Sequence, residues 1–191
     1  MSKNSFIIPC SFVLFIFLFS CKGNQTFIPK PPTYLKIEFP ERSYAFYQDE
    51  CDFSFETPSY FNIEKIATSC NRDIHFTSLN GTLHLSYIKM DTSLAAYVNY
   101  ALNKIDDHKV KATAIYDSVF LNNETKVYGT FFELQGNVAS PFHFYLTDST
   151  DYFMNGVVYF NARPNYDSIK PVLNFVKEDL YKIMTTTKWS K

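Results

Sequence analysis

The sequence lacks both an excess of one charge and any motif of a known catalytic site. Its 18 Lys and Arg residues nearly balance its 19 Asp and Glu residues, and no basic stripe is present. The charge pattern therefore argues against nucleic acid as a partner. No G-x-S-x-G, H-E-x-x-H, P-loop or dinucleotide-binding motif occurs, so we predict no enzyme activity, no catalytic residues and no cofactor.

Long apolar runs are also scarce, and the one clear run is too short to cross a membrane. It extends from Phe6 to Phe19, about fourteen residues, whereas a membrane-spanning helix needs roughly 20 residues. Lys3 precedes this run, as in the basic start of a secretory signal. We therefore predict a signal peptide over residues 1–20 and an exported protein.

The end of this run resembles a bacterial lipobox. Leu18-Phe19-Ser20-Cys21 places a cysteine where such signals are cleaved, so we predict that Cys21 becomes the first residue and carries lipid chains such as palmitate. Two or more such chains hold a protein stably on a membrane. The alternative is an ordinary signal peptide, or an uncleaved anchor, with an incidental cysteine.

Two further cysteines, Cys51 and Cys70, lie downstream of the predicted lipobox. An exported chain meets an oxidising compartment, where these two residues can form a disulfide. Closing a loop of about 20 residues would stabilise the fold by roughly 3 kcal/mol. Two buried free thiols are the alternative. We predict no metal site, because neither cysteine has a CxxC partner or a nearby histidine pair.

The chain divides into three parts in this interpretation. Residues 1–20 are the lipoprotein signal peptide, and residues 21–34 are the lipidated cysteine and a flexible tether that contains three prolines. Residues 35–191 are long enough to form a single domain with its own core.

Short alternating runs predict an antiparallel sheet within that domain. The clearest signal is the hairpin at 73–88, where Asn80-Gly81 is a strong two-residue turn. With that turn, Ile74 would lie opposite Tyr87, and the apolar side chains of both arms would share the core face. Further strands are predicted at 35–39, 51–58, 60–67, 114–121, 126–135, 141–147 and 156–162.

Two segments show helical rather than alternating periodicity. One apolar stripe runs from Leu94 to Ile105 and another from Ile169 to Met184. Asp91 or Ser93 could cap the first helix, and Asp167 or Ser168 the second. The order of strands, helix, strands and helix predicts an α+β fold, an antiparallel β-sheet covered by two amphipathic helices. The same order is similar to the PsbP-like fold, an analogy on topology alone.

The four histidines offer only weak signals of a site. His75 and His84 share one predicted sheet face without a third ligand, so we interpret them as polar residues on a solvated face. His108 lies in a charged segment after the first helix, and His143 alternates with two phenylalanines in a predicted strand. We expect both to be exposed to solvent.

Asp148, Asp151 and Arg163 are further candidates for a functional site. Asp148 and Asp151 bracket Ser149-Thr150, which is ordinary turn chemistry, although paired carboxylates could also perform acid–base catalysis. Arg163 follows an apolar strand. It could pair with an acidic residue at the end of the sheet or contact a partner protein.

Several segments together resemble one known family. They are the lipobox, "PKPPTYLKIEFPERSY", "CDFSFETPSY", "NGTLHLSY", "KVYGTFFELQGNVASPFHFYLTDST" and "YFNARPNYDSIKPVLNFVKEDL". In this order they are similar to the gliding-motility lipoprotein GldD family of Bacteroidota, from about Cys21 to Trp189. The resemblance supports Cys21 as the lipidated residue and supplies no catalytic residues.

The resemblance implies a non-enzymatic lipoprotein of the cell envelope, required for gliding motility and linked to the type IX secretion machinery. Its partners would be the membrane, through the lipid anchor, and other gliding or secretion proteins of the envelope. Lys22-Gly23-Asn24-Gln25 lacks acidic residues after the cysteine, so we expect the domain to face the periplasm. Two alternatives are a lipid-anchored ligand-binding carrier with a cleft between sheet and helices and a hydrolase built around Asp148, Asp151 and a histidine.

Overall fold

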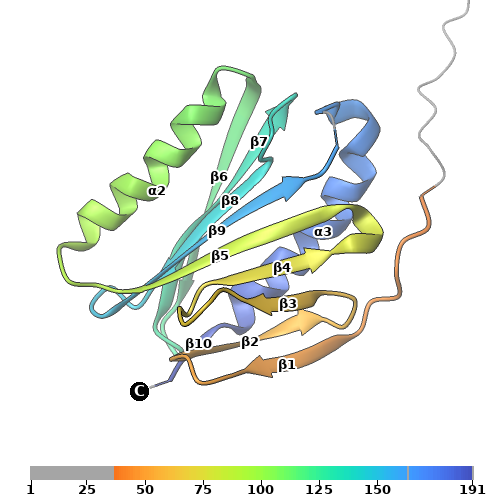
Figure 1. Cartoon of the computed structure of the whole chain (residues 1–191). Coiled ribbons are helices and arrows are strands. Elements are labelled where there is room, and N and C mark those ends of the chain that lie inside the picture. Colours follow the sequence, from red (N-terminus) through yellow and green to blue (C-terminus); the bar gives the residue numbers. More distant parts are fainter. Residues whose placement is uncertain (1–36, 163, 191) are drawn as a thin grey trace, which may run out of the picture. The chain divides into compact units, whose positions relative to one another are not determined.

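A computed structural model describes residues 37–162 and 164–190 (Figure 1). The predicted signal peptide, Cys21 and the tether up to residue 34 lie outside the described residues, and so does Arg163. In the described part, two antiparallel sheets and two α-helices form the α+β fold that the sequence predicts.

Seven strands form the larger sheet, and every pairing in it is antiparallel. Consecutive strands lie side by side except where β9 pairs with β5, which brings the two halves of the sheet together. In spatial order the strands are β3 (Asn62–Lys65), β4 (Arg72–Phe76), β5 (Gly81–Lys89), β9 (Tyr152–Phe160), β8 (Phe142–Thr147), β7 (Val127–Gly136) and β6 (Ala112–Asn122).

A smaller sheet of three strands lies beside the first (Figure 1). Its strands are β1 (Tyr44–Gln48), β2 (Phe53–Pro58) and β10 (Lys188–Trp189), with β2 in the centre. Strand β2 is present as predicted from the sequence, whereas β1 and β10 were not predicted. The strand expected at 35–39 is wrong for its described residues, because residues 37–39 are not in a strand.

The two helices lie on opposite faces of the larger sheet. Helix α3 (Tyr166–Thr186) packs on the face that contains the main core, where the ring of Tyr181 lies 4.7 Å from the ring of Phe131. Helix α2 (Leu94–Lys109) packs on the other face, where Ile105 contacts Leu134. The two amphipathic helices therefore cover the sheet as predicted.

Helix α2 begins where the sequence predicts, and α3 does not. Ser93 is the residue before α2, as expected, although its side chain makes no capping hydrogen bond. Helix α3 begins two or three residues earlier than expected, with Asn165 as the capping residue, so Asp167 lies inside its first turn. An acidic residue there interacts favourably with the helix dipole.

The hairpin of β4 and β5 is present, but its register differs from the prediction. Phe76 lies opposite Gly81, and Ile74 lies opposite Leu83 rather than Tyr87. The reason is the turn: Thr77–Leu79 form a short 3-10 helix, η2, before Asn80 adopts a left-handed conformation with φ of 55°. The offset spans an even number of residues, so the predicted side chains still face the core.

Cys51 and Cys70 form a disulfide that joins the two sheets. Cys51 lies between β1 and β2, and Cys70 lies between β3 and β4. Beside it, the buried guanidinium of Arg72 donates a hydrogen bond to the Cys51 sulfur and pairs with the carboxylate of Asp49. A covalent bond and a buried ion pair therefore hold the same corner of the molecule.

Within residues 37–162 and 164–190, no helix is both long and apolar enough to cross a membrane.

Candidate binding site between β6 and α3

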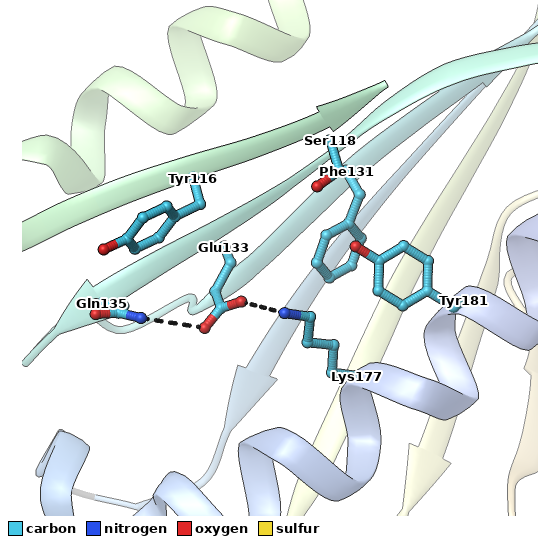
Figure 2. Close-up of a pocket in the computed structure, with 7 residues that line it drawn as sticks. All are labelled: Tyr116, Ser118, Phe131, Glu133, Gln135, Lys177 and Tyr181. Carbon is cyan, nitrogen blue, oxygen red and sulfur yellow. Dashed lines mark hydrogen bonds and ion pairs between the residues drawn. The ribbon is translucent and has the colours of Figure 1, made fainter. Parts of the chain in front are cut away.

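A surface pocket of about 350 Å³ opens between the end of the larger sheet and α3 (Figure 2). Strands β6 and β7 supply one wall, and α3 supplies the other. Side chains of α3 reach β7, where Lys177 contacts Glu133, whereas Tyr116 on the outermost strand, β6, stays exposed. It is lined by Tyr116, Ser118, Phe131, Glu133, Gln135, Lys177 and Tyr181.

The pocket has an apolar floor and a polar mouth. The ring of Phe131 is fully buried against Tyr181 and belongs to the main core. Glu133 and Gln135 follow Phe131 at alternate positions of β7, so all three side chains point to the same face. The core face of β7 therefore changes from apolar to polar where the pocket opens.

An ion pair spans the pocket from the strand to the helix. The amine of Lys177 donates a hydrogen bond of 2.6 Å to Glu133 Oε2, and the amide of Gln135 approaches Glu133 Oε1 at 3.5 Å (Figure 2). Partial burial lowers the pKa of Lys177, but the hydrogen bond and charge of Glu133 outweigh it and raise that pKa above its usual value. Lys177 therefore stays protonated at neutral pH and is suited to binding a polar group rather than to acting as a base or nucleophile.

The outer strand beside the pocket carries unusually exposed apolar side chains. Tyr116, Val119 and Leu121 are 56, 68 and 70% exposed, respectively. Tyr116 lines the pocket, whereas Val119 and Leu121 alternate with it and point to the other face. Both faces of β6 therefore present apolar surface, which is typical of a contact site for another polypeptide.

Neither Glu133 nor Lys177 was among the predicted site residues. A usable signal was present in "TFFELQ", because Glu133 falls two residues after Phe131, on the face of β7 that carries apolar side chains up to that point. Lys177 gave no such signal. It lies beside the apolar stripe of α3, where an exposed lysine is ordinary.

The histidines occupy three different environments. His75 interacts with Thr82 and Glu64, and His84 lies 2.6 Å from Asp73. The two share the α2 side of the sheet, as expected. No group of three metal-binding side chains occurs among the described residues.

The expectation that His143 and His108 are exposed is wrong. His143 is only 2% exposed, and His108, in the last turn of α2, is half-buried against it with ring centroids 5.3 Å apart. Strand alternation correctly placed His143 opposite the core phenylalanines. It could not show that α2 covers that second face.

Asp148 performs the turn chemistry that the sequence indicates. Its Oδ1 accepts hydrogen bonds from the backbone N–H groups of Thr150, Asp151 and Tyr152. Burial raises the pKa of Asp148, but these hydrogen bonds outweigh burial and lower it. The two carboxylates thus build a turn, and no histidine joins them in the contacts of this segment.

One comparison with known proteins gave a match. A family model described as "Gliding motility lipoprotein GldD" matches residues 24–189. No curated protein matches the chain.

Proposed function

Since the chain belongs to the gliding motility lipoprotein GldD family, its role is in gliding motility, and we propose that it acts there as a non-enzymatic accessory component linked to the type IX secretion machinery. In this proposal it works by contact with other envelope proteins. The observation that carries the proposal is the extent of the match, which covers residues 24–189 and so includes every described helix and strand.

The geometry of the β6–α3 site supports a binding role. Tyr116, Val119 and Leu121 offer an exposed apolar surface on an outer strand. The two charged groups of the adjacent pocket are already paired, because Lys177 and Glu133 neutralise each other. Such a surface suits protein contact, in which apolar side chains are buried and a polar rim gives specificity.

The family name and the absence of a membrane-crossing helix among the described residues fit a membrane-anchored lipoprotein of the envelope. We propose further that the anchor is a lipid, with palmitate among its chains, on Cys21 after removal of the signal peptide, and that the domain faces the periplasm. The lipobox and the absence of acidic residues at 22–25 support these two points.

The first experiment is complementation of a gene deletion, read out as spreading on soft agar and as secretion of a type IX cargo protein. We expect deletion to stop both, wild type to restore both, and Cys21→Ala to restore neither. Normal spreading of the deleted cells would refute the gliding role in this organism. Lost spreading with normal secretion would refute only the link to secretion.

The pocket favours one second candidate, a lipid-anchored ligand carrier. A volume of about 350 Å³ lies near the lower end of the range for small-molecule sites, and Lys177 would bind an anionic group. Native mass spectrometry of the chain purified from membranes would test this. If the protein is a carrier, we expect a bound molecule that is lost in Lys177→Met and kept in the control variant Lys104→Met. In the wild type, Lys104 lies over the ring of Tyr100 on α2. A protein that carries no additional mass would exclude the carrier.

A further inference from the structure

The two edges of the seven-stranded sheet differ in their protection against strand pairing. Strand β3 is short, with four residues that include Glu64 and Lys65. Strand β6 has 11 residues, of which only Asp117 is charged. Natural proteins usually shorten or charge an edge strand, because its unpaired N–H and C=O groups attract another strand. Strand β6 largely lacks these devices.

The regularly paired part of β6 could pair with the same segment of a second copy over its whole length. A register shift between Ala112 and Ala114 marks a bulge at the start of the strand, and regular pairing with β7 then continues to Asn122. The midpoint of the segment from Ala114 to Asn122 is Ser118. Antiparallel pairing of two copies about a twofold axis at Ser118 would therefore use every regular residue of the edge.

The charges beside this segment favour the same arrangement. Lys111 precedes it, Glu124 follows it, and both are exposed. In an antiparallel pair centred on Ser118, Ala112 of one copy lies opposite position 124 of the other, so Lys111 of each copy falls within one position of Glu124 of the other. Asp117 would lie opposite Val119 of the second copy, whereas a pair centred one residue earlier would place the two Asp117 carboxylates opposite each other.

The apolar side chains also match in this register. Tyr116 would lie opposite Phe120 of the second copy on the pocket face. Ile115 would lie opposite Leu121 of the second copy on the α2 face. Aromatic and β-branched cross-strand pairs of this kind stabilise antiparallel sheets.

From these observations we infer that a second copy of the chain pairs with the edge of β6, antiparallel and centred on Ser118, to form a twofold dimer with one continuous sheet. The inference does not depend on the role in gliding, since it concerns association of the protein with itself. Confinement of lipid-anchored copies to one membrane would raise their effective concentration.

Cross-linking tests the centre of the pair. We expect Ser118→Cys in the full-length chain, oxidised in membranes, to give a covalent dimer, because directly opposite residues lie within disulfide distance. Wild type gives the background from its own cysteines, and Ser168→Cys, at an exposed serine of α3, controls for random collision. Cross-linking no higher than in Ser168→Cys would overturn the inference.

Charge reversal tests the orientation and does not depend on cysteine chemistry. The measurement is sedimentation equilibrium of the full-length chain in excess detergent micelles. We expect Lys111→Glu and Glu124→Lys each to weaken dimerisation roughly tenfold, because each contact occurs twice in the dimer. The double swap should restore it. Phe46→Lys, on the edge strand β1 of the other sheet, should have no effect.

Three outcomes would refute this dimer. They are a wild-type chain that stays monomeric at all concentrations, a dimer that is equally weakened by Phe46→Lys, and a double swap that weakens it further. The first outcome includes the case in which the chain is monomeric and another envelope protein binds to the edge of β6. That protein, and not a second copy of the chain, would then be the partner of β6. Circular dichroism of each variant identifies any that fail to fold.

Discussion

Among individual residues, Asp179 has the most consequential environment. It lies on the apolar face of α3 and is 0% exposed. Its carboxylate accepts hydrogen bonds from the hydroxyl groups of Tyr44 and Tyr60, and Arg42 Nε lies 3.2 Å from it. The pKa of Tyr44 is raised to about 12, mainly by burial and next by the hydrogen bond to Asp179. The cluster ties α3 to β1 and to the segment after β2.

We predict that Asp179→Ala lowers the free energy of unfolding by about 3 kcal/mol, because it leaves two tyrosine hydroxyl groups without their acceptor and removes the buried one of the two carboxylates that pair with Arg42. The control is Glu178→Gln at the neighbouring residue, which also pairs with Arg42 but is 67% exposed; it should cost less than about 1 kcal/mol. Urea unfolding of both variants provides the measurement. Equal losses would show that burial of Asp179 is not the source of the effect.

His143 is the second residue with an unusual environment. Neither of its ring nitrogens has a hydrogen-bond partner among the described residues. Burial, and then the neighbouring His108, lowers the pKa of His143 to about 4. Its folded-state pKa is thus below the unfolded value, so the unfolded chain binds this proton more readily. The stability due to neutral burial is present above the unfolded value and is lost as the pH falls towards 4.

The shift from 6.5 to about 4 corresponds to about 3 kcal/mol. We therefore predict that, when the pH falls from 7 to 4.5, the free energy of unfolding of His143→Leu decreases by about 2 kcal/mol less than that of wild type. The reason is that leucine binds no proton on unfolding and has no buried nitrogen without a partner. Thermal or urea unfolding at a series of pH values would measure this difference. Parallel pH profiles of the two proteins would contradict it.

At the scale of elements, the two helices differ in how firmly they are held. Seven residues of α3 are buried, but only Ala101 and Ile105 of α2 are buried. Tyr100 and Leu102 of α2 remain exposed. Since most helix stability in proteins comes from packing of the apolar face, α2 should open without global unfolding.

We predict that amide hydrogen exchange is at least about tenfold faster across Leu94–Lys109 than across Leu173–Thr186. Mass spectrometry of peptides from the two helices, in one sample and at one pH, would provide the comparison. Similar protection of both helices would mean that α2 unfolds only with the rest of the domain.

Helix α3, the β4–β5 hairpin and Asp179 show which parts of the fold could be predicted from the sequence. The stripe of α3 is confirmed because its period matches residues that are truly buried. The hairpin register is wrong because η2 lengthens a turn that Asn80-Gly81 alone would have closed. Asp179 was missed because an acidic residue in a helix is ordinarily exposed, and only the distant Arg42 and tyrosines permit its burial.

Less of the candidate site than of the fold could be predicted from the sequence. Alternation indicated that "AIYDSVFL" is a strand, and β6 includes all of it. Nothing in that alternation indicated that β6 would be an outer strand, because sheet order depends on how β9 returns to β5. The pocket depends on the same topology, since Glu133 and Lys177 are distant in sequence and meet only through the packing of α3.

At the scale of the whole molecule, two sheets share one core and are joined at a corner. The core contains Phe53 and Phe55 from the smaller sheet and Phe144 from the larger one, together with Leu180 of α3. At the corner, the Cys51–Cys70 disulfide and the Arg72–Asp49 pair cross from one sheet to the other. The disulfide closes a sequence separation of 19 residues.

We predict that the double variant Cys51→Ala/Cys70→Ala folds but loses about 3 kcal/mol of stability, as expected for a loop of this length. A reducing agent should lower the stability of wild type towards that of the variant and leave the variant unchanged. Urea unfolding with and without the reductant would measure both effects. Because the corner also contains a buried ion pair, Arg72→Met should cost a further amount in the double variant, since the largely buried carboxylate of Asp49 loses its guanidinium partner. If the disulfide alone held the two sheets together, the double variant would already have lost its cooperative transition, and Arg72→Met would have no further stability to remove.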